Sequence, residues 1–362
     1  MSSAAASLAA SPMLRAPILP TLLRMSLPNV AAMGAMAAVA IAETAYVGYL
    51  GTPALAGLAL VFPMAMLQQM MSAGAMGGGV SSAVARAFGA GDEARARALA
   101  FHATLICALG GLVFTVGMTV WGEAVFRALG GRGAALEEAL AYARIVFLGS
   151  VPIWLTNTFS SVLRGTGNMR VPSLALLLVN AAQVVLGGAL GFGVGPLPRL
   201  GIAGVALGQL IAYSAGSAFL FWYLAAGRAK VALRLRGTAV DGAMFRDILR
   251  VGALACLSPV QTVLTSLIAT RVVAGGGTAA LAGYGIGARL EFLLVPITFG
   301  IGVATVPLVG MAIGAGDAVR ARRVAWTAVG LSFAVVGAVG LVVSVAPDLW
   351  ARMFSAEPAV LE

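Results

Sequence analysis

The most restrictive feature of this chain is a pair of short phrases that each occur twice. Gly-Thr-Pro-Ala-Leu-Ala-Gly begins at residue 51, and Gly-Thr-Ala-Ala-Leu-Ala-Gly begins at residue 277, an offset of 226 residues. Gly-Ala-Gly-Asp begins at residue 89 and again at residue 314, an offset of 225 residues, and arginines follow both copies. The shared offset indicates an internal duplication, so the chain should fold as two related halves.

The composition indicates that the duplicated chain is a membrane protein. Of the 362 residues, 60% are hydrophobic and only 10% are charged, whereas soluble domains carry about 25% charged residues. The 47 glycines suit membrane helices, which pack through close approach of their backbones. Residues 1–13 lack a basic segment followed by a cleavable apolar one, so we expect no signal peptide. The net charge of +10 is explained by membrane topology and does not require nucleic acid as a partner.

Nine stretches between charged residues are apolar and approach or exceed the roughly 20 residues that a membrane-spanning helix requires. They occupy residues 26–50, 54–85, 98–122, 142–163, 171–193, 200–227, 250–270, 281–312 and 324–346. We therefore expect an all-α polytopic membrane protein built from two parallel-repeat helical bundles. The first bundle has six helices and the second has three of an expected six.

The distribution of Lys and Arg orients these spans. If the chain crosses the membrane at each span, 16 cationic residues fall on one side and 6 on the other. Cationic loops stay cytoplasmic, so we expect a multi-pass inner-membrane protein with a cytoplasmic N-terminus. Six spans return the chain to its starting side before the second half begins. The halves are then parallel repeats about an axis along the membrane normal.

Four segments follow from this count of spans. Residues 1–25 form a cytoplasmic N-terminal segment, and residues 26–227 form the six-helix bundle. Residues 228–246 form a basic cytoplasmic linker, and residues 247–362 form an incomplete bundle of three helices. By the observed period, a matching second half would need about another hundred residues. The sequence leaves open whether residue 362 is a natural end.

The order of several motifs resembles the multidrug and toxic compound extrusion (MATE) family. Glu-Thr-Ala-Tyr-Val-Gly-Tyr-Leu-Gly at 43–51 is similar to the stretch with which the family ends its first helix. Arg-Gly-Thr-Gly-Asn at 164–168 resembles the family's loop between the fourth and fifth helices. Ala-Leu-Ala-Gly at 54–57 and Gly-Ala-Gly-Asp at 89–92 follow where the family has them. In the second half, Leu-Ala-Gly-Tyr-Gly-Ile at 281–286 and Pro-Leu-Val-Gly at 307–310 are similar to the matching segments. The resemblance covers residues 20–350.

This resemblance implies two bundles around a central cavity and transport by alternating access. It implies export of organic, often cationic and hydrophobic, compounds in exchange for H⁺ or Na⁺. Glu43 stands where the family commonly has Asp, and Gly187 stands where many proton-coupled members have an acidic residue. Span 250–270 lacks the acidic residue of many sodium-coupled members, which favours H⁺. We expect no cofactor beyond the coupling ion, no metal site and no obligate protein partner besides lipid and small-molecule substrates.

Glu43 is the leading candidate for the ion-coupling site. It interrupts an apolar run between Arg24 and Arg86, and an ionisable group inside a membrane is a functional hypothesis by default. Burial disfavours the charged form of a carboxyl group, so Glu43 could exchange protons and bind a cationic compound in turn. Alternatively, Glu43 lies about 28 Å along a helix from Arg24, which would place it in solvent at the outer interface.

Further polar residues within the spans are candidates for ion coupling or substrate binding. Pairs at helical spacing share a face, namely Asn180 with Gln183 and Gln209 with Tyr213. Arg289 and Glu291 are two residues apart and therefore do not share a face. The candidate set is Glu43, Tyr46, Gln68, Asn157, Asn180, Gln183, Gln209, Tyr213 and Glu291. The alternative is that these side chains form interhelical hydrogen bonds that only hold the bundle together.

The remaining distinctive residues favour structural roles. Each Gly-Ala-Gly-Asp phrase is expected to form a turn in which Asp92 or Asp317 caps the next helix. His102 should lie near the lipid headgroups. Prolines and the glycines at 74 and 77–79 are either hinges or static points of close packing. With one histidine and two cysteines, no catalytic constellation is present, and we do not expect an enzyme.

Two other functions stay open at this stage. A lipid-linked precursor flippase of the related superfamily would have the same fold, but it would favour a cationic cavity for a pyrophosphate headgroup. The spans contain almost no cation except Arg289, which argues against a flippase. A non-transporting truncated remnant is the other alternative, and sequence downstream of the gene would test it.

Overall fold

Long helices make up most of the described chain, which comprises residues 12–234, 237–274 and 278–346 of this computed structural model. Eight helical segments among these residues are long and apolar enough to cross a membrane, or up to nine if the bent pair α7–α8 is one span. The all-α expectation is confirmed. The elements are α2 (Pro12–Arg15), α3 (Ile18–Leu50), α4 (Thr52–Gln69), η1 (Met70–Met76), α5 (Gly77–Gly89), α6 (Glu93–Ala128), α7 (Gly133–Leu148), α8 (Ser150–Gly165), α9 (Arg170–Phe192), α10 (Ile202–Ala225), α11 (Gly242–Ala255), α12 (Leu257–Ala274), α13 (Thr278–Gly314) and α14 (Ala318–Val345).

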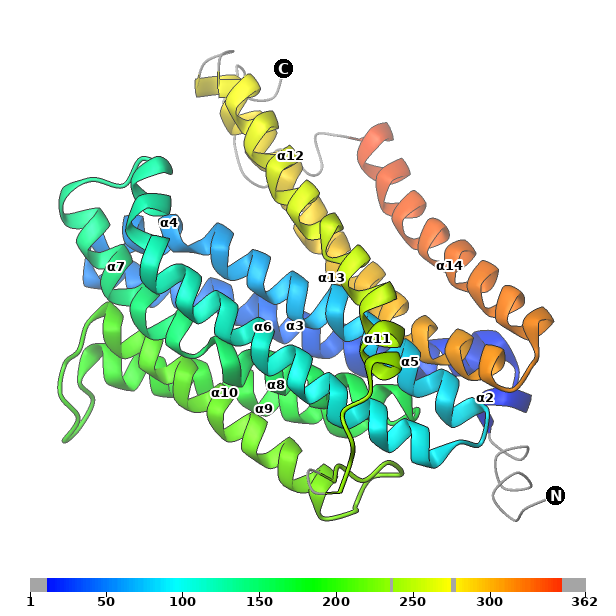
Figure 1. Ribbon diagram of the computed structural model, residues 1–362. Coiled ribbons are helices and arrows are strands. Elements are labelled where there is room, and N and C mark those ends of the chain that lie inside the picture. Colours follow the sequence, from blue (N-terminus) through cyan, green and yellow to red (C-terminus); the bar gives the residue numbers. More distant parts are fainter. Residues whose placement is uncertain (1–11, 235–236, 275–277, 347–362) are drawn as a thin grey trace.

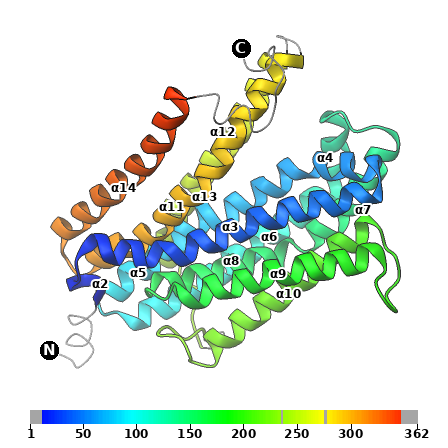
Figure 2. The same cartoon turned by 180° about the vertical axis from the view of Figure 1, so that it is seen from behind.

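The helices form a bundle and a diverging arm that meet at one end. Helices α3 to α10 lie side by side in the bundle, while α12, α13 and α14 lean away from it (Figures 1 and 2). At the end near α2, which we call the base, α13 packs against α3 and α5. Glycines permit this contact, because a Cβ at Gly314 would collide with the backbone of Arg86, and one at Gly89 with that of Met311. Away from the base, the arm and the bundle diverge (Figures 1 and 2).

Several helix boundaries differ from the sequence prediction. Helix α3 begins at Ile18 rather than at residue 26, and α11 begins at Gly242 rather than at residue 250. The span expected at 142–163 belongs to two helices, α7 and α8, that meet at Gly149 with a bend of 45°. The span expected at 250–270 is likewise divided into α11 and α12. Pro259 lies in the first turn of α12, where its missing N–H would have no helical partner in any case.

The two Gly-Ala-Gly-Asp turns have the same geometry, which confirms the capping prediction. Asp92 Oδ1 accepts a hydrogen bond of 2.8 Å from the backbone N–H of Arg95. Asp317 Oδ1 accepts one of 2.8 Å from the backbone N–H of Arg320. The preceding glycines have φ angles of 77° and 80°, a left-handed conformation that favours glycine. Both turns lie at the base, where the two copies of the repeat pack together.

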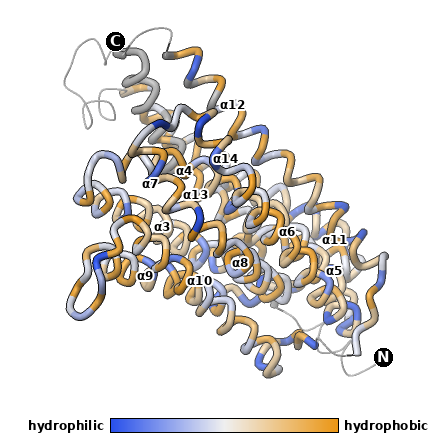
Figure 3. The backbone as a smooth tube through the Cα atoms, turned by 60° about the vertical axis from the view of Figure 1, so that its left-hand side comes forward, coloured by the Kyte–Doolittle hydropathy of each residue, from blue (hydrophilic) through white to orange (hydrophobic). Residues whose placement is uncertain are grey.

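The outer surface of the bundle suits a lipid environment. Large apolar side chains are exposed along α6, including Leu109, Val113, Val120 and Trp121. Figure 3 shows hydrophobic residues along the lengths of the helices and hydrophilic residues mainly towards their ends. In water such a surface would be a liability, whereas in a bilayer it is the ordinary exterior of a spanning bundle.

Candidate functional site

Glu43 lies inside the bundle and has a protein partner. Its side chain is buried in α3, and Gln183 Nε2 of α9 donates a hydrogen bond of 2.6 Å to Glu43 Oε1. Glu43 makes no ion pair with any Lys or Arg that the structure describes. The structure therefore does not place Glu43 in solvent at the membrane interface. It is a buried acid held by a neutral amide, and its ionisation would leave a buried charge without a counter-ion.

Three tyrosines surround this acid. Tyr46 of α3, Tyr142 of α7 and Tyr213 of α10 are all close enough to Glu43 to interact with it electrostatically. Tyr142 was not among the predicted residues, because it occupies an ordinary apolar stretch between the charges of α7. The Tyr46 hydroxyl lies over Gly187, where an added Cβ would come within 3.0 Å of it. The space that a side chain at position 187 would need is thus filled by Tyr46.

Other predicted polar residues hold helices together. Ser150 Oγ donates a hydrogen bond of 2.8 Å to Gln68 Oε1, which joins α4 to α8. Asn157 Nδ2 donates one of 2.9 Å to Ser72 Oγ, which joins α8 to η1. These two contacts fit the alternative interpretation, in which polar side chains form interhelical hydrogen bonds that hold the bundle together. Gln209 is only half-buried and makes no hydrogen bond among the described residues.

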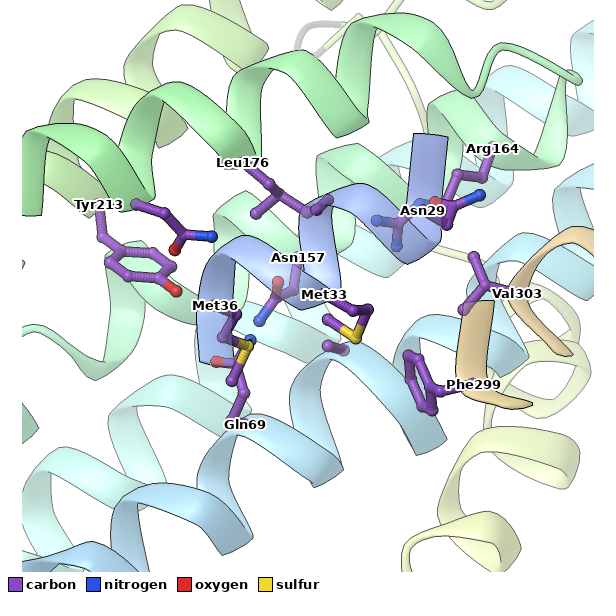
Figure 4. A pocket seen from close by; sticks show the side chains of 13 residues that line it. Asn29, Met33, Met36, Gln69, Asn157, Arg164, Leu176, Tyr213, Phe299 and Val303 are labelled. Carbon is purple, nitrogen blue, oxygen red and sulfur yellow. The ribbon is translucent and has the colours of Figure 1, made fainter. Parts of the chain in front are cut away.

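A narrow pocket of about 20 Å³ brings three of the predicted residues together. Asn157, Asn180 and Tyr213 line it together with Gln69, the neighbour of the predicted Gln68. Figure 4 shows Tyr213 at one end of this pocket and Asn29 and Arg164 at the other. The α13 residues Phe299 and Val303 bound it on the side of the arm.

A wider cleft of about 410 Å³ lies between the bundle and α13. Glycines of η1 and α5 line one wall, and apolar residues of α13 line the other. Its polar lining consists of Ser81, Ser161, Arg164 and Thr298. Arg164 thus lines both spaces, and it is the one charged residue in the described lining of either.

Only some of the predicted site residues therefore line a cavity. Glu43, Tyr46, Gln68, Gln183 and Gln209 do not line either space. The side chains of Glu291 and Arg289 lie outside the described residues. Two of the glycines predicted as hinges or packing points make close contacts, because a Cβ at Gly77 would collide with Ser161 and one at Gly79 with Gly252, whereas one at Gly78 would meet nothing within 4 Å.

Two predictions about basic residues need correction. The spans were expected to contain almost no cation except Arg289, but Arg164 lies in the last turn of α8 and is 6% exposed. His102 was expected near the headgroups, but it is fully buried in α6. Its Nε2 accepts a hydrogen bond of 2.8 Å from the backbone N–H of Asp241. His102 therefore fixes the linker ahead of α11, and only the folded chain brings these residues together.

Comparison with known proteins identifies the family. The family model for MatE matches residues 28–187 and 255–362. The chain belongs to the MatE family. A probable multidrug resistance protein NorM of Deinococcus radiodurans is 32% identical over 87% of this chain and 68% of that protein. An FAD transporter of Shewanella oneidensis is 27% identical over 97% of this chain and 77% of that protein.

Solved structures of MATE transporters have the same architecture. A MOP superfamily transporter from Pyrococcus furiosus superposes with a TM-score of 0.87, covering 97% of this chain and 77% of that one, at 27% identity. A multidrug resistance MATE transporter in an outward-facing conformation superposes with a TM-score of 0.85 at 27% identity, covering 96% and 77%. As a MatE protein, this chain is a multi-pass membrane transporter rather than an enzyme.

Proposed function

We propose that this MatE protein exports small organic compounds across the cell inner membrane in exchange for protons, with its N-terminus in the cytoplasm. The observation that supports coupling best is the environment of Glu43. Its carboxyl group lies inside the bundle, accepts a hydrogen bond from Gln183 and has no cationic partner among the described residues. Its charge can be removed by a proton or balanced by a bound cation. Such groups mark ion pathways in membrane proteins.

Proton exchange at Glu43 would act on the packing of α3. When Glu43 is ionised, the amide of Gln183 can stabilise it, and the hydroxyls of Tyr46, Tyr142 and Tyr213 are the nearby groups able to donate further hydrogen bonds. When Glu43 is protonated, its O–H becomes a donor and needs an acceptor. The two protonation states therefore favour different arrangements of α3, α7, α9 and α10. Because α3 also packs against α13, a shift of α3 can alter the base of the cleft.

The base is the closed gate of this arrangement. Asp247 of α11 forms ion pairs with Arg86 of α5 and with Arg95 of α6, the second at 3.0 Å. These pairs join the start of the second half to the first half at the end where the glycine contacts lie. Alternating access would break the pairs and open this end while the opposite side of the cleft closes.

The class of cargo has two candidates. Several matched proteins are named multidrug resistance or multidrug export proteins, which supports a drug-like organic cargo, and the resemblance to the MATE family implies that such a cargo is often cationic and hydrophobic. One is named an FAD transporter, and the Pyrococcus furiosus protein is described by the reverse polarity of its binding pocket. The described lining of the two spaces contains no carboxylate and one guanidinium, which favours an anionic cargo over a cationic one.

Flux in proteoliposomes tests proton coupling. We expect a proton gradient to drive export of a fluorescent compound and a sodium gradient alone to fail. Glu43→Gln should lower proton-driven flux by about 100-fold, because the amide cannot exchange a proton. The matched control is Glu123→Gln, since Glu123 is exposed on α6 and pairs only with Arg127. Flux that survives in Glu43→Gln, or that follows the sodium gradient, would overturn the proposal.

A further inference from the structure

Arg164 is a buried cation without a counter-ion among the described residues. It is 94% buried, given its 6% exposure, yet its side chain makes no ion pair or hydrogen bond with the described residues, and its Nε atom is fully enclosed without a partner. Its place in the last turn of α8 provides some favourable interaction with the helix dipole. That interaction does not satisfy the five N–H donors of a guanidinium. A buried charge with an unsatisfied donor is costly, and a ligand in the spaces that Arg164 lines could satisfy this charge.

The surroundings of Arg164 match an amphipathic ligand. Ser81 lies on the same wall of the cleft as Arg164, and its Oγ is buried without a hydrogen-bond partner. The hydroxyl of Ser161, which also lines the cleft, donates to the backbone carbonyl of Asn157. On the opposite wall lie the apolar side chains of Val295, Phe299, Val303 and Val306. One part of the cleft can therefore hold an anionic oxygen group, and the other can hold a hydrophobic body.

We propose that Arg164 is the anion-binding residue of the central cleft, and that it takes the phosphate or carboxylate group of an amphipathic organic compound. Guanidinium groups bind both kinds of anion through paired N–H···O bonds, which a single ammonium cannot form. The bound anion supplies a counter-charge that the described residues do not provide at this position. The inference rests on the proposed transport function, since it names the cargo of the same cleft.

The test is equilibrium binding to the purified protein in phosphatidylcholine nanodiscs. Three probes share one ring system and differ in charge: 1-naphthyl phosphate, neutral 1-naphthol and cationic 1-naphthylmethylamine. We expect the unmodified protein to bind the phosphate most tightly. Arg164→Gln should weaken binding of the phosphate about tenfold or more and leave binding of naphthol unchanged, with Arg164→Lys intermediate. Arg127→Gln is the matched control, because Arg127 is exposed and pairs with Glu123.

Two results would overturn the inference. One is equal or tighter binding of the amine or the alcohol by the unmodified protein, which requires no variant to fold. The other is a folded Arg164→Gln protein that keeps its affinity for naphthyl phosphate. Adding phosphatidylglycerol to the nanodiscs separates two sources of the anion. Competition with the probe supports a lipid headgroup at Arg164, and lack of competition supports a free cargo.

The binding experiment on Arg164 and the flux experiment on Glu43 can fail independently of each other. Binding at equilibrium needs neither a gradient nor Glu43, which lies outside the lining of the cleft. A protein that binds naphthyl phosphate through Arg164 but shows no proton-driven flux would retain the anion site and lose the coupling proposal. A protein with proton-driven flux and no preference for anions would lose only the anion site.

Discussion

Glu43 and Arg164 are both charged residues buried in the same bundle, but their surroundings differ. Glu43 has a hydrogen-bond donor in Gln183 and is enclosed by packed helices. Arg164 has no such partner among the described residues and lines two open spaces. A group that is satisfied and enclosed suits exchange of a small ion. A group that is unsatisfied and faces a cavity suits a larger ligand. Under the proposed function, ion exchange and cargo binding would then take place at separate positions in the bundle.

The Glu43 centre and the cleft should respond differently to an added methyl group. A Cβ at Gly208 of α10 would collide with the backbone of Gly187 next to the Glu43 centre, whereas one at Gly302 in the cleft would meet nothing within 4 Å. We expect Gly208→Ala to lower the free energy of unfolding by about 1–3 kcal/mol. Gly302→Ala should stay neutral or gain up to about 1 kcal/mol from helix propensity. Thermal unfolding in detergent measures both, and equal losses would contradict the difference in packing.

A second prediction concerns the base. Asp247→Asn removes the ion pairs with Arg86 and Arg95, whose side chains are 26% and 46% exposed. Because exposed pairs contribute little, we expect a shift of about 1 kcal/mol toward an open base. A cysteine placed at the buried Met311 should then react several-fold faster with a water-soluble maleimide. The control is Glu123→Gln in the same Met311→Cys background, and unchanged reactivity in Asp247→Asn would show that the pairs do not close the base.

The smallest predicted effect concerns Gln68, which neither contacts Glu43 nor lines the spaces that Arg164 lines. Among the described residues, its side chain makes one hydrogen bond, which it accepts from Ser150. Interhelical hydrogen bonds in membranes are worth about 0.6 kcal/mol on average. We therefore expect Gln68→Leu with Ser150→Ala to reduce unfolding stability by about that amount and to leave flux and probe binding unchanged. A large loss of flux at normal stability would instead place Gln68 within the transport machinery.

Local signals in the sequence predicted the helical elements well. Long apolar runs located the spans because a bilayer fixes the length of a helix. The Asp92 and Asp317 turns were predictable because capping involves only neighbouring residues. Errors arose where one span consists of two helices, as at Gly149, since apolar composition does not register a bend. They also arose at Ile18 and Gly242, where helices extend beyond the apolar core.

By itself the sequence determined that the chain is a duplicated bundle of membrane helices, because hydrophobic length and repeated turn motifs are properties of contiguous residues. It also drew attention to Glu43, since a carboxyl group in an apolar run is visible without a fold. The tertiary structure decided that Gln183 and three tyrosines surround Glu43 and that Arg164 faces a cavity. Burial, hydrogen-bond partners and cavities depend on how helices that are distant in the sequence rotate and pack against one another. The residues around Arg164 in the sequence therefore do not indicate that its side chain faces a cavity.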